Sequence, residues 1–512
     1  MLRYVCLIAL LFFGQIGKAG ELNRGEPVEV NVDLNKVTNV MRGGIGASWH
    51  AIEKPIPIGH GGSGWGAYPP ADDERAWQQI YRHAGWLGLD WNRVEIEQRI
   101  YEPERGHFTF DSPEMRILYR ILDWNQQHGA DVFFQQMWIN AAWLAYPQAS
   151  DDPITRVHSG PRDMDAFADG LATLMEHLIK KRGYTCIKWL SITNEPGANW
   201  SWWQGSFGQP LPIGPGLAAV RKALDRRGLN LPLSGPDSGL DMLTAFKPED
   251  ARFVGAFDFH DYSIKIDSES AGYLEKQVRD ISGWINSAHA AGKPVFITEF
   301  GSVEDSARPV ENRPDKPGTV LAAAEFVIRD ANAGVDGFNR WSYLNRGDLD
   351  GLWQYVDTWD AAHNRLLSEF TPHANSYFGI GLLSRLIAKH SAVLATKVSG
   401  ARVKRSQRVF CAAFRSANGN VTLAIVNDAT EEFPLHVSWV GAPPAKRFFR
   451  YRYGKPQYGR ADVKVDPDPE FAPASGAAWT DSLPPQSLTI YSNFELRNDA
   501  PGVMVDEPEH RN

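Results

Sequence analysis

The sequence has very little cysteine, with three residues in a chain of 512. Cys6 lies in an N-terminal segment that we expect to be removed, and Cys186 and Cys411 lie in segments that we assign to different domains. A fold stapled by disulfides is therefore excluded, and a hydrophobic core must hold the chain together. Cysteine and histidine also form no cluster at metal-ligand spacing, so we predict no metal site.

The chain also lacks the features that mark nucleic-acid and membrane partners. Lys and Arg number 53 against 61 Asp and Glu, for a net charge of −8, and no basic block stands out. This balance excludes the usual basic surface for nucleic acid. After the first 20 residues no apolar run is long enough to cross a bilayer, so we predict no membrane association of the mature chain.

Aromatic side chains are what the sequence has in excess. It contains 18 Trp, 16 Tyr and 25 Phe, together 12% of all residues. Such side chains fill cores, but they also provide the flat, amphipathic surfaces on which sugar rings stack.

The N-terminus has the pattern of a secretory signal peptide. Arg3 precedes the apolar run Tyr4–Phe13, and the small residues Gly17 and Ala19 offer a cleavage site before Gly20. The run is too short to span a bilayer. We therefore predict a signal peptide over residues 1–19 and a secreted or periplasmic protein, with an uncleaved anchor as the alternative.

Between residues 40 and 390 short apolar runs alternate with segments of helical periodicity. Alternating strands and amphipathic helices indicate parallel βαβ units. Eight such units predict an α/β fold of the closed (β/α)8 barrel type. An open doubly wound sheet is the alternative, weakened because no glycine-rich nucleotide fingerprint follows any strand. The predicted strands are Gly44–Trp49, Leu89–Ile96, Asp131–Trp138, Ile187–Thr193, Leu231–Gly235, Phe257–Tyr262, Pro294–Phe300 and Gly334–Tyr343.

The pattern changes after residue 390 to short strand-like runs separated by turn residues such as Asn418-Gly419-Asn420. This is typical of an antiparallel β-sandwich, which we place at residues 391–496. The run Val28–Val32, within an N-terminal segment 20–39, has no helix after it and could add a strand to that domain. Residues 497–512 form a polar tail.

Two glutamates stand at the ends of predicted barrel strands, where function is located in this architecture. Glu195 follows the fourth strand in Thr193-Asn194-Glu195-Pro196, and Glu299 ends the seventh in Thr298-Glu299-Phe300. Two carboxyl groups facing one bond, one protonated and one ionised, are what glycoside hydrolysis requires. The alternative is that each glutamate is simply solvated.

Residues 40–390 resemble a clan A glycoside hydrolase, in motif style family 5, the cellulase-like family. The resemblance implies a retaining mechanism with Glu195 as acid/base and Glu299 as nucleophile. It further implies roles in substrate binding or support for five more residues that match the clan pattern: Arg93, Asn194, His260, Tyr262 and Trp341. The appended sandwich is similar to that of families 30 and 39 and of the ceramide-glycan-cleaving branch of family 5.

The supporting residues have physical roles and structural alternatives. Arg93 would keep Glu299 ionised, and Tyr262 would donate its hydroxyl to the same carboxylate. His260 could polarise Glu195 or contact sugar, and Trp341 would stack beneath it. Each could instead be a paired or packed core residue. Where many family 5 members carry a histidine, the third strand ends in Trp138-Ile139-Asn140, and Trp138 and Asn140 are candidates for lining the site.

Other tryptophans and acids near the predicted mouth leave alternatives open. An aromatic rim for sugar stacking is one interpretation of the loop tryptophans, and packing between loops accounts for about half of them. They are Trp65, Trp143, Trp200, Trp202, Trp203, Trp353 and Trp359. Glu95 and Glu97 are spare acids, and pairing of either with Glu195 would give an inverting enzyme instead.

We therefore predict a secreted retaining β-glycosidase that acts on a carbohydrate and needs no metal or organic cofactor. The alternatives are an exo-acting enzyme of family 30 or 39 type on small glycosides or glycolipids, a transglycosidase, and a non-catalytic carbohydrate-binding protein.

Overall fold

The computed structural model describes residues 27–52, 68–139, 141–147, 159–198, 201–239, 246–264, 270–302, 317–344, 354–360, 363, 365–400, 408–442, 447–471 and 478–503. The predicted signal peptide, Asn140 and the tryptophans Trp65, Trp200 and Trp353 lie outside these residues.

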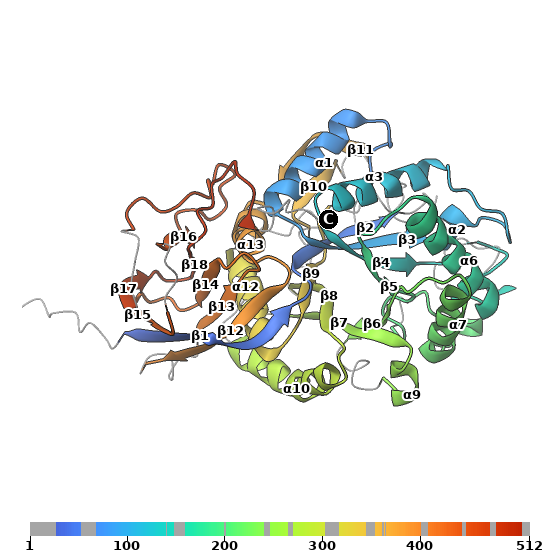
Figure 1. The fold of residues 1–512 in the computed structure, drawn as a ribbon. Helices are drawn as coiled ribbons and strands as arrows, with labels where there is room; N and C mark the ends of the chain where they lie inside the picture. The colour runs from blue at the N-terminus through green and yellow to red at the C-terminus, as the bar shows by residue number, and fades with distance from the viewer. Residues whose placement is uncertain are drawn as a thin grey trace, which may run out of the picture.

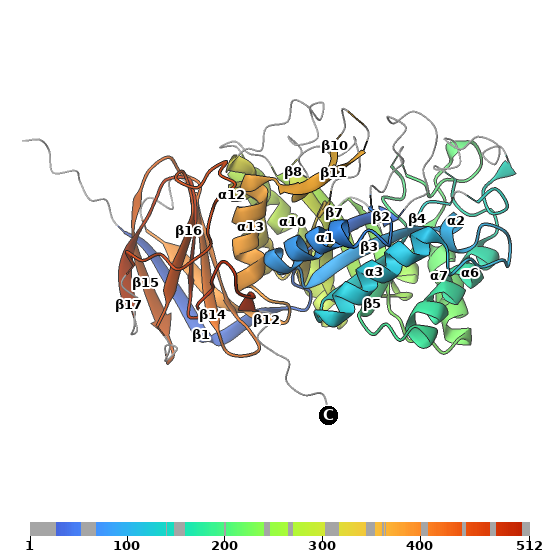
Figure 2. The ribbon, with the colours of Figure 1, turned by 90° about the horizontal axis from the view of Figure 1, so that it is seen from above.

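Eight parallel strands close into a barrel, as predicted, with helices around it (Figures 1 and 2). Pairing of β2 with β9 closes the ring, with Ile45 opposite Phe338. Each predicted barrel strand corresponds to one observed strand. The strands are β2 (Ile45–Ile52), β3 (Trp91–Glu97), β4 (Asp131–Met137), β5 (Ile187–Ser191), β6 (Leu233–Gly239), β7 (Val254–Ile264), β8 (Val295–Ser302) and β9 (Gly337–Arg340).

The helices follow the sequence signals. At the start of α3, Ser112 accepts a hydrogen bond from the amide of Met115 and Pro113 occupies the first turn, which satisfies the exposed amides of a helix start. The helices are α1 (Glu74–Leu87), α2 (Gln98–Tyr101), α3 (Pro113–Gln127), α6 (Met164–Glu176), the π-helix η1 (His177–Lys181), the 3-10 helix η2 (Ser206–Gly208), α7 (Ile213–Arg226), α9 (Pro248–Ala251), α10 (Ser270–Ala290), α12 (Pro317–Ala333) and α13 (Ala374–Leu386).

The barrel interior has an apolar floor below a polar layer. Trp91, Phe133 and Phe296 form a buried cluster with Ala256 across the ring. Side chains two positions further along a strand point the same way, so Arg93, Gln135 and Thr298 follow above this floor. Strand alternation therefore places the polar groups at the carboxyl ends of the strands.

A second domain is one eight-stranded sheet in the order β16-β18-β14-β13-β12-β1-β15-β17. The predicted strand at Val28–Val32 is confirmed as part of β1, which pairs antiparallel with β12 and parallel with β15. The sheet's other pairs are antiparallel. Its strands are β1 (Val28–Met41), β12 (Ser391–Ser399), β13 (Val409–Arg415), β14 (Val421–Asn427), β15 (Phe433–Val440), β16 (Phe449–Tyr453), β17 (Ala478–Leu483) and β18 (Ser487–Ser492).

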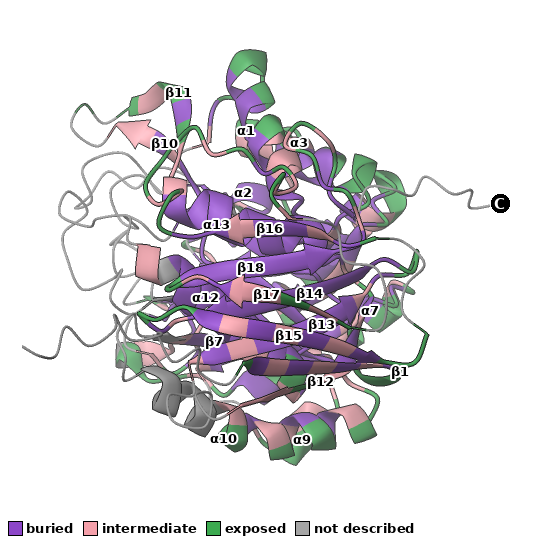
Figure 3. Ribbon diagram, turned by 90° about the vertical axis from the view of Figure 1, so that its left-hand side faces the viewer, coloured by how far each residue is buried: buried purple, intermediate pink, exposed green. Residues whose placement is uncertain are grey.

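The middle of this sheet is buried on both faces (Figure 3). Along β14, Leu423 and Ile425 face the core of the β-domain, whereas Ala424 and Val426 join the larger core that includes the barrel helices. At the far side, β15 alternates buried and half-buried residues. Two-sided burial explains why β14 reads as a continuous apolar run, and it fixes the β-domain against α12 and α13.

Three of the observed strands were not predicted from the sequence. The strand β17 and the hairpin of β10 (Val356–Asp360) and β11 (Arg365–Pro372) are polar or partly exposed, so hydrophobic periodicity is weak there.

Cys186 and Cys411 are buried free thiols. Among the described residues, no helix has the length and apolar character needed to cross a membrane.

Packing of α13 between the domains leaves no room at Gly379. A Cβ there would overlap Val320 of α12 and approach the Tyr453 ring of β16 to 3.2 Å. We expect Gly379→Ala to lower the free energy of unfolding by about 1–3 kcal/mol through overpacking, measured by urea denaturation. The matched control is Gly283→Ala in α10, where a Cβ meets nothing within 4 Å. That change should stabilise the helix by up to about 1 kcal/mol, and equal effects of the two changes would contradict this packing.

Candidate active site

The two predicted glutamates face each other at the barrel mouth. Glu195 follows β5 and Glu299 lies in β8, and one carboxylate oxygen of each, together with a ring nitrogen of His260, lie within 4.8 Å of one another. The side chain of Glu195 is 18% exposed and that of Glu299 is 6% exposed. Carboxyl groups this close match a retaining site, where about 5–5.5 Å separates them, better than an inverting one.

Both oxygens of Glu299 are held by donors. Arg93 Nη1 lies 2.5 Å from Oε1, and the Tyr262 hydroxyl donates to Oε2 at 2.6 Å. Burial and the charges of Glu299 and Glu195 raise the pKa of Tyr262 well above its usual value, so its hydroxyl stays protonated. These contacts fix the orientation of the Glu299 carboxylate.

Glu195 has an unusual backbone conformation, with φ at 45°. Residues other than glycine seldom adopt this left-handed conformation, and it costs free energy. The Glu195 amide donates to the carbonyl of Asp237 at 2.7 Å, and His260 Nδ1 lies 3.0 Å from Glu195 Oε1. Two anchors thus hold the residue with its carboxyl group toward Glu299.

Asp237, at the end of β6, is a central residue of this hydrogen-bond network that sequence reasoning missed. Its carboxylate lies 3.0 Å from His260 Nε2 and 3.3 Å from Arg93 Nη2, and it also accepts hydrogen bonds from Thr298 and Gln135. The predicted fifth barrel strand ended at Gly235, two residues short. Extending the strand-end rule by those two residues would have found it.

Opposite charges around His260 decide its protonation. Burial lowers the pKa of His260, but the charges of Glu299 and Asp237 and the hydrogen bonds to Asp237 and Glu195 outweigh it and hold the pKa well above its usual value. The ring is therefore an imidazolium near neutral pH and donates from both nitrogens, to Glu195 and to Asp237. Burial also raises the pKa of Asp258 to about 8, with the charge of Asp237 adding to the effect.

The charge of Glu299 is set by competing effects. Burial raises its pKa above the usual value, and the charge of Glu195 adds to this. The positive charges of His260 and Arg93 and the hydrogen bond from Tyr262 act in the opposite direction. Arg93 itself stays charged, because Glu95, Glu299 and Asp237 raise its pKa despite complete burial.

The remaining predicted residues divide into two groups. Asn194 accepts a hydrogen bond from Arg93 Nη2 at 2.7 Å, and the Arg93 guanidinium lies 5.8 Å from the centre of the Trp341 ring. Asn194 and Trp341 therefore lie beside Arg93, next to the two glutamates. Trp138 is 6% exposed, and its carbonyl accepts from Gln136 and from the amide of Gln98. These contacts place Trp138 in the wall next to β3.

The loop tryptophans and spare acids have mostly structural partners. Trp202 and Trp203 are fully buried and pack edge to face at 5.2 Å, so they do not form an aromatic rim. Trp143 donates to the carbonyl of Glu102. The side chain of Glu95 contacts Arg93, and Glu97 pairs with Arg99 at 2.6 Å. The carboxylate that faces Glu195 is therefore Glu299.

Glu195, His260 and Glu299 are also the described residues whose ligand atoms are close enough to hold a metal ion. A cation there would lie beside the Arg93 guanidinium and the His260 imidazolium, and it would displace the donors that occupy both oxygens of Glu299. Like-charge repulsion disfavours such a site. The arrangement suits acid–base and nucleophilic chemistry.

Solved structures share this architecture. A glycoside hydrolase family 30 subfamily 8 xylanase from Clostridium acetobutylicum is similar at a TM-score of 0.60 and 16% identity, over 91% of this chain and 99% of that one. An α-L-arabinofuranosidase from Thermotoga maritima is similar at a TM-score of 0.60 and 14% identity, over 92% of this chain and 100% of that one. A conserved exported protein from Bacteroides fragilis is similar at a TM-score of 0.62 and 13% identity, over 90% of this chain and 99% of that one.

The fold is that of a clan A glycoside hydrolase. This confirms the predicted barrel with its appended β-domain, and the predicted affinity to family 30 has a counterpart in structure. Family 5 itself is not shown by these structures. No protein-family model and no curated protein matches the sequence.

The network predicts that Asp237 keeps His260 charged. In Asp237→Asn the carboxylate is lost while burial remains, so the pKa of His260 should fall and the ring should lose its proton at lower pH. Side-chain nitrogen NMR across a pH titration measures this, with the His260 signals assigned from His260→Gln. As a control, Asp336→Asn removes an acid that pairs with His289 and should leave His260 unchanged. An unchanged His260 titration in Asp237→Asn would show that Asp237 does not set the charge.

Proposed function

We propose that the protein is an exported retaining β-glycosidase. The observation that carries the proposal is the pair Glu195 and Glu299, with carboxylate oxygens within 4.8 Å at the mouth of the barrel. A retaining enzyme needs one carboxyl group that attacks the sugar and one that donates a proton to the leaving oxygen, on either side of a single bond.

Glu299 is the nucleophile in this mechanism. It is the more buried carboxylate, and Arg93 and Tyr262 fix it. It attacks the anomeric carbon and forms a glycosyl-enzyme while the bond to the leaving oxygen breaks. Water then attacks the same carbon, and the bond between that carbon and the Glu299 oxygen breaks. This frees the sugar and regenerates the Glu299 carboxylate, so that two inversions give net retention.

Glu195 is the general acid and then the general base. It first gives its proton to the leaving oxygen, and it later removes one from the attacking water. It is the more exposed of the pair, which suits exchange of the leaving group and water. His260 donates to its Oε1 and acts as a positioning residue. Asn194 and Trp341 contact the bound sugar in this mechanism, a role supported by their position next to Arg93.

The substrate class is a β-linked glycoside or polysaccharide, and no cofactor takes part in the steps above. The named activities of similar structures, a xylanase, an α-L-arabinofuranosidase and an endo-β-1,6-glucanase, differ from one another. Export is supported by the signal-like N-terminus and by the similar exported protein from Bacteroides fragilis.

A trapped intermediate tests the nucleophile. Reaction with a panel of 2-fluoro glycosides, followed by peptide mapping, should place the label on Glu299, because the fluorine slows release of the glycosyl-enzyme. Glu299→Gln should abolish labelling. Glu97→Gln, which changes another acid at the mouth, should leave the label on Glu299. Label on any other carboxylate would overturn the assignment, and the sugar that reacts fastest would narrow the substrate.

The Tyr262 hydroxyl should set the acid limb of activity. Its hydrogen bond lowers the pKa of Glu299, so in Tyr262→Phe that pKa rises and protonation inactivates the nucleophile at higher pH. Loss of a hydrogen bond to a charged group costs about 1.5–3 kcal/mol, so kcat/KM should fall about 10- to 100-fold. The acid limb of the kcat/KM profile should move to higher pH. The control is Tyr81→Phe, because the Tyr81 hydroxyl donates to a backbone carbonyl outside the site. If Tyr262→Phe and Tyr81→Phe gave the same pH profile, the proposed role of Tyr262 would be refuted.

A further inference from the structure

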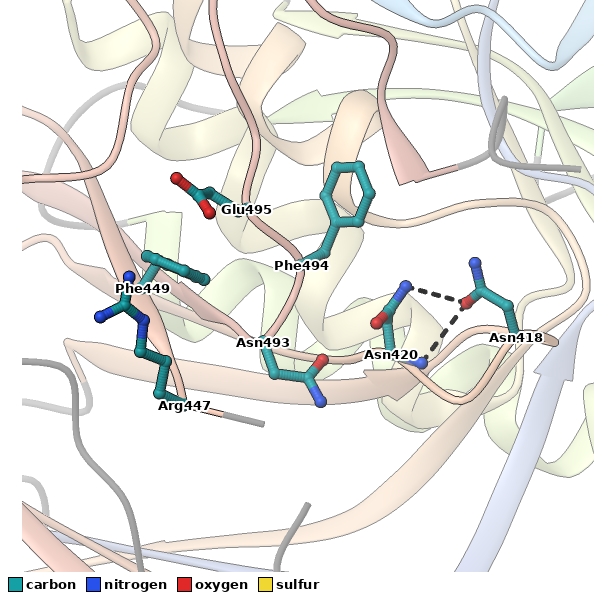
Figure 4. Close-up of a pocket in the computed structure, with 7 residues that line it drawn as sticks. All are labelled: Asn418, Asn420, Arg447, Phe449, Asn493, Phe494 and Glu495. Carbon is teal, nitrogen blue, oxygen red and sulfur yellow. Dashed lines mark hydrogen bonds between the residues drawn. The ribbon is translucent and has the colours of Figure 1, made fainter. Parts of the chain in front are cut away.

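A pocket of about 580 Å³ opens on the β-domain, and neither of the two glutamates lines it (Figure 4). It lies between the turn that joins β13 to β14, the start of β16 and the segment that follows β18. We call it the β-domain pocket. Its size is in the range that takes small-molecule ligands.

Three asparagines give the pocket a fixed set of donors and acceptors. Asn493 Oδ1 accepts from the amide of Val421 at 2.7 Å, which directs its Nδ2 away from that contact. Asn418 Oδ1 accepts from Asn420 Nδ2 at 3.0 Å. Asn493 Nδ2, Asn418 Nδ2 and Asn420 Oδ1 have no hydrogen-bond partner among the described residues. The fold therefore orients two amide donors and one acceptor before any ligand arrives.

The other lining groups combine apolar surface with balanced charge. Phe449 and Phe494 are half-buried, and both line the pocket. The guanidinium of Arg447 lies 4.9 Å from the centre of the Phe449 ring, which restrains it. Glu495 supplies the opposite charge and also contacts Arg497. Because Arg447 and Glu495 offset each other, the lining favours neither an anion nor a cation.

We propose that the β-domain pocket binds a neutral carbohydrate. A sugar offers vicinal hydroxyl groups, which both donate and accept, and C–H surfaces that pack on aromatic rings. The amide array and the two phenylalanines match these two properties. A phosphate or carboxylate ligand would meet Glu495, and a cationic ligand would meet Arg447.

The pocket and the active site lie toward opposite ends of the barrel. Beside the pocket, Thr422 donates to the carbonyl of Leu386 at the end of α13. That end of α13 meets Leu87, where α1 leads to the start of β3. The glutamates lie at the other, carboxyl ends of the barrel strands. The pocket thus holds a polysaccharide without obstructing the mouth, which makes it an anchoring site.

Polysaccharide retention measures the proposed binding directly. The full chain carrying Glu299→Gln, which leaves the polymer intact, is run in affinity electrophoresis through gels with xylan, β-1,6-glucan, arabinan, mannan or hydroxyethyl cellulose. At least one gel should retard it. Adding Asn418→Ala and Arg447→Ala, both exposed positions, should weaken binding to that polymer at least about tenfold, from two lost hydrogen-bonding groups.

Matched variants separate the pocket from the active site. Asn35→Ala with Arg460→Ala makes the same exchanges at exposed positions elsewhere in the β-domain and should not change retention. With Glu299 intact, the pocket variant should hydrolyse an aryl glycoside at the unchanged rate. If the wild-type chain and every variant with Glu299 intact lack that activity, the result counts against the proposed glycosidase function and not against the β-domain pocket. Equal retention of the pocket and control variants, or no retention on any neutral polymer, would overturn the proposal.

Discussion

The buried guanidinium of Arg93 is the constraint on which the site depends. It has no solvent exposure, and it contacts the carboxylates of Glu95, Glu299 and Asp237. A buried charge is tolerated only when it is paired, and removing one partner typically costs about 3–5 kcal/mol. The barrel therefore cannot keep Arg93 without the acids, and the acids on separate strands cannot lie so close without Arg93.

This constraint explains how two glutamates in one pocket can take different roles. Arg93 and His260 supply two positive charges, whereas Glu95, Asp237, Glu299 and Glu195 are four acids around them. Electroneutrality favours protonation of a carboxyl group in the cluster. Glu299, beside Arg93 and the Tyr262 hydroxyl, is the one best held as an anion. In the proposed mechanism the proton is carried by Glu195, the more exposed carboxyl group, which faces the leaving group.

Sequence periodicity was sufficient for the barrel strands and for the two glutamates, because parallel strands buried on both faces produce apolar runs with sharp ends. It failed where structure depends on distant contacts. Asp237 acquires its role only through His260 and Arg93, which come from other strands. Trp202 and Trp203 looked like a binding rim, yet they pack against Phe167 inside the fold. The amide array of the β-domain pocket joins residues from two separate turns and has no motif in the chain.

The anomeric configuration of the first product tests the central claim most directly. Proton NMR of a β-glycoside during the first minutes of hydrolysis distinguishes the two outcomes before the released sugar mutarotates. Carboxylates within 4.8 Å of each other, one attacking and one donating, predict that the β-anomer forms first. Initial formation of the α-anomer would mean that water attacks directly, and it would contradict the assignment of Glu299 as the nucleophile.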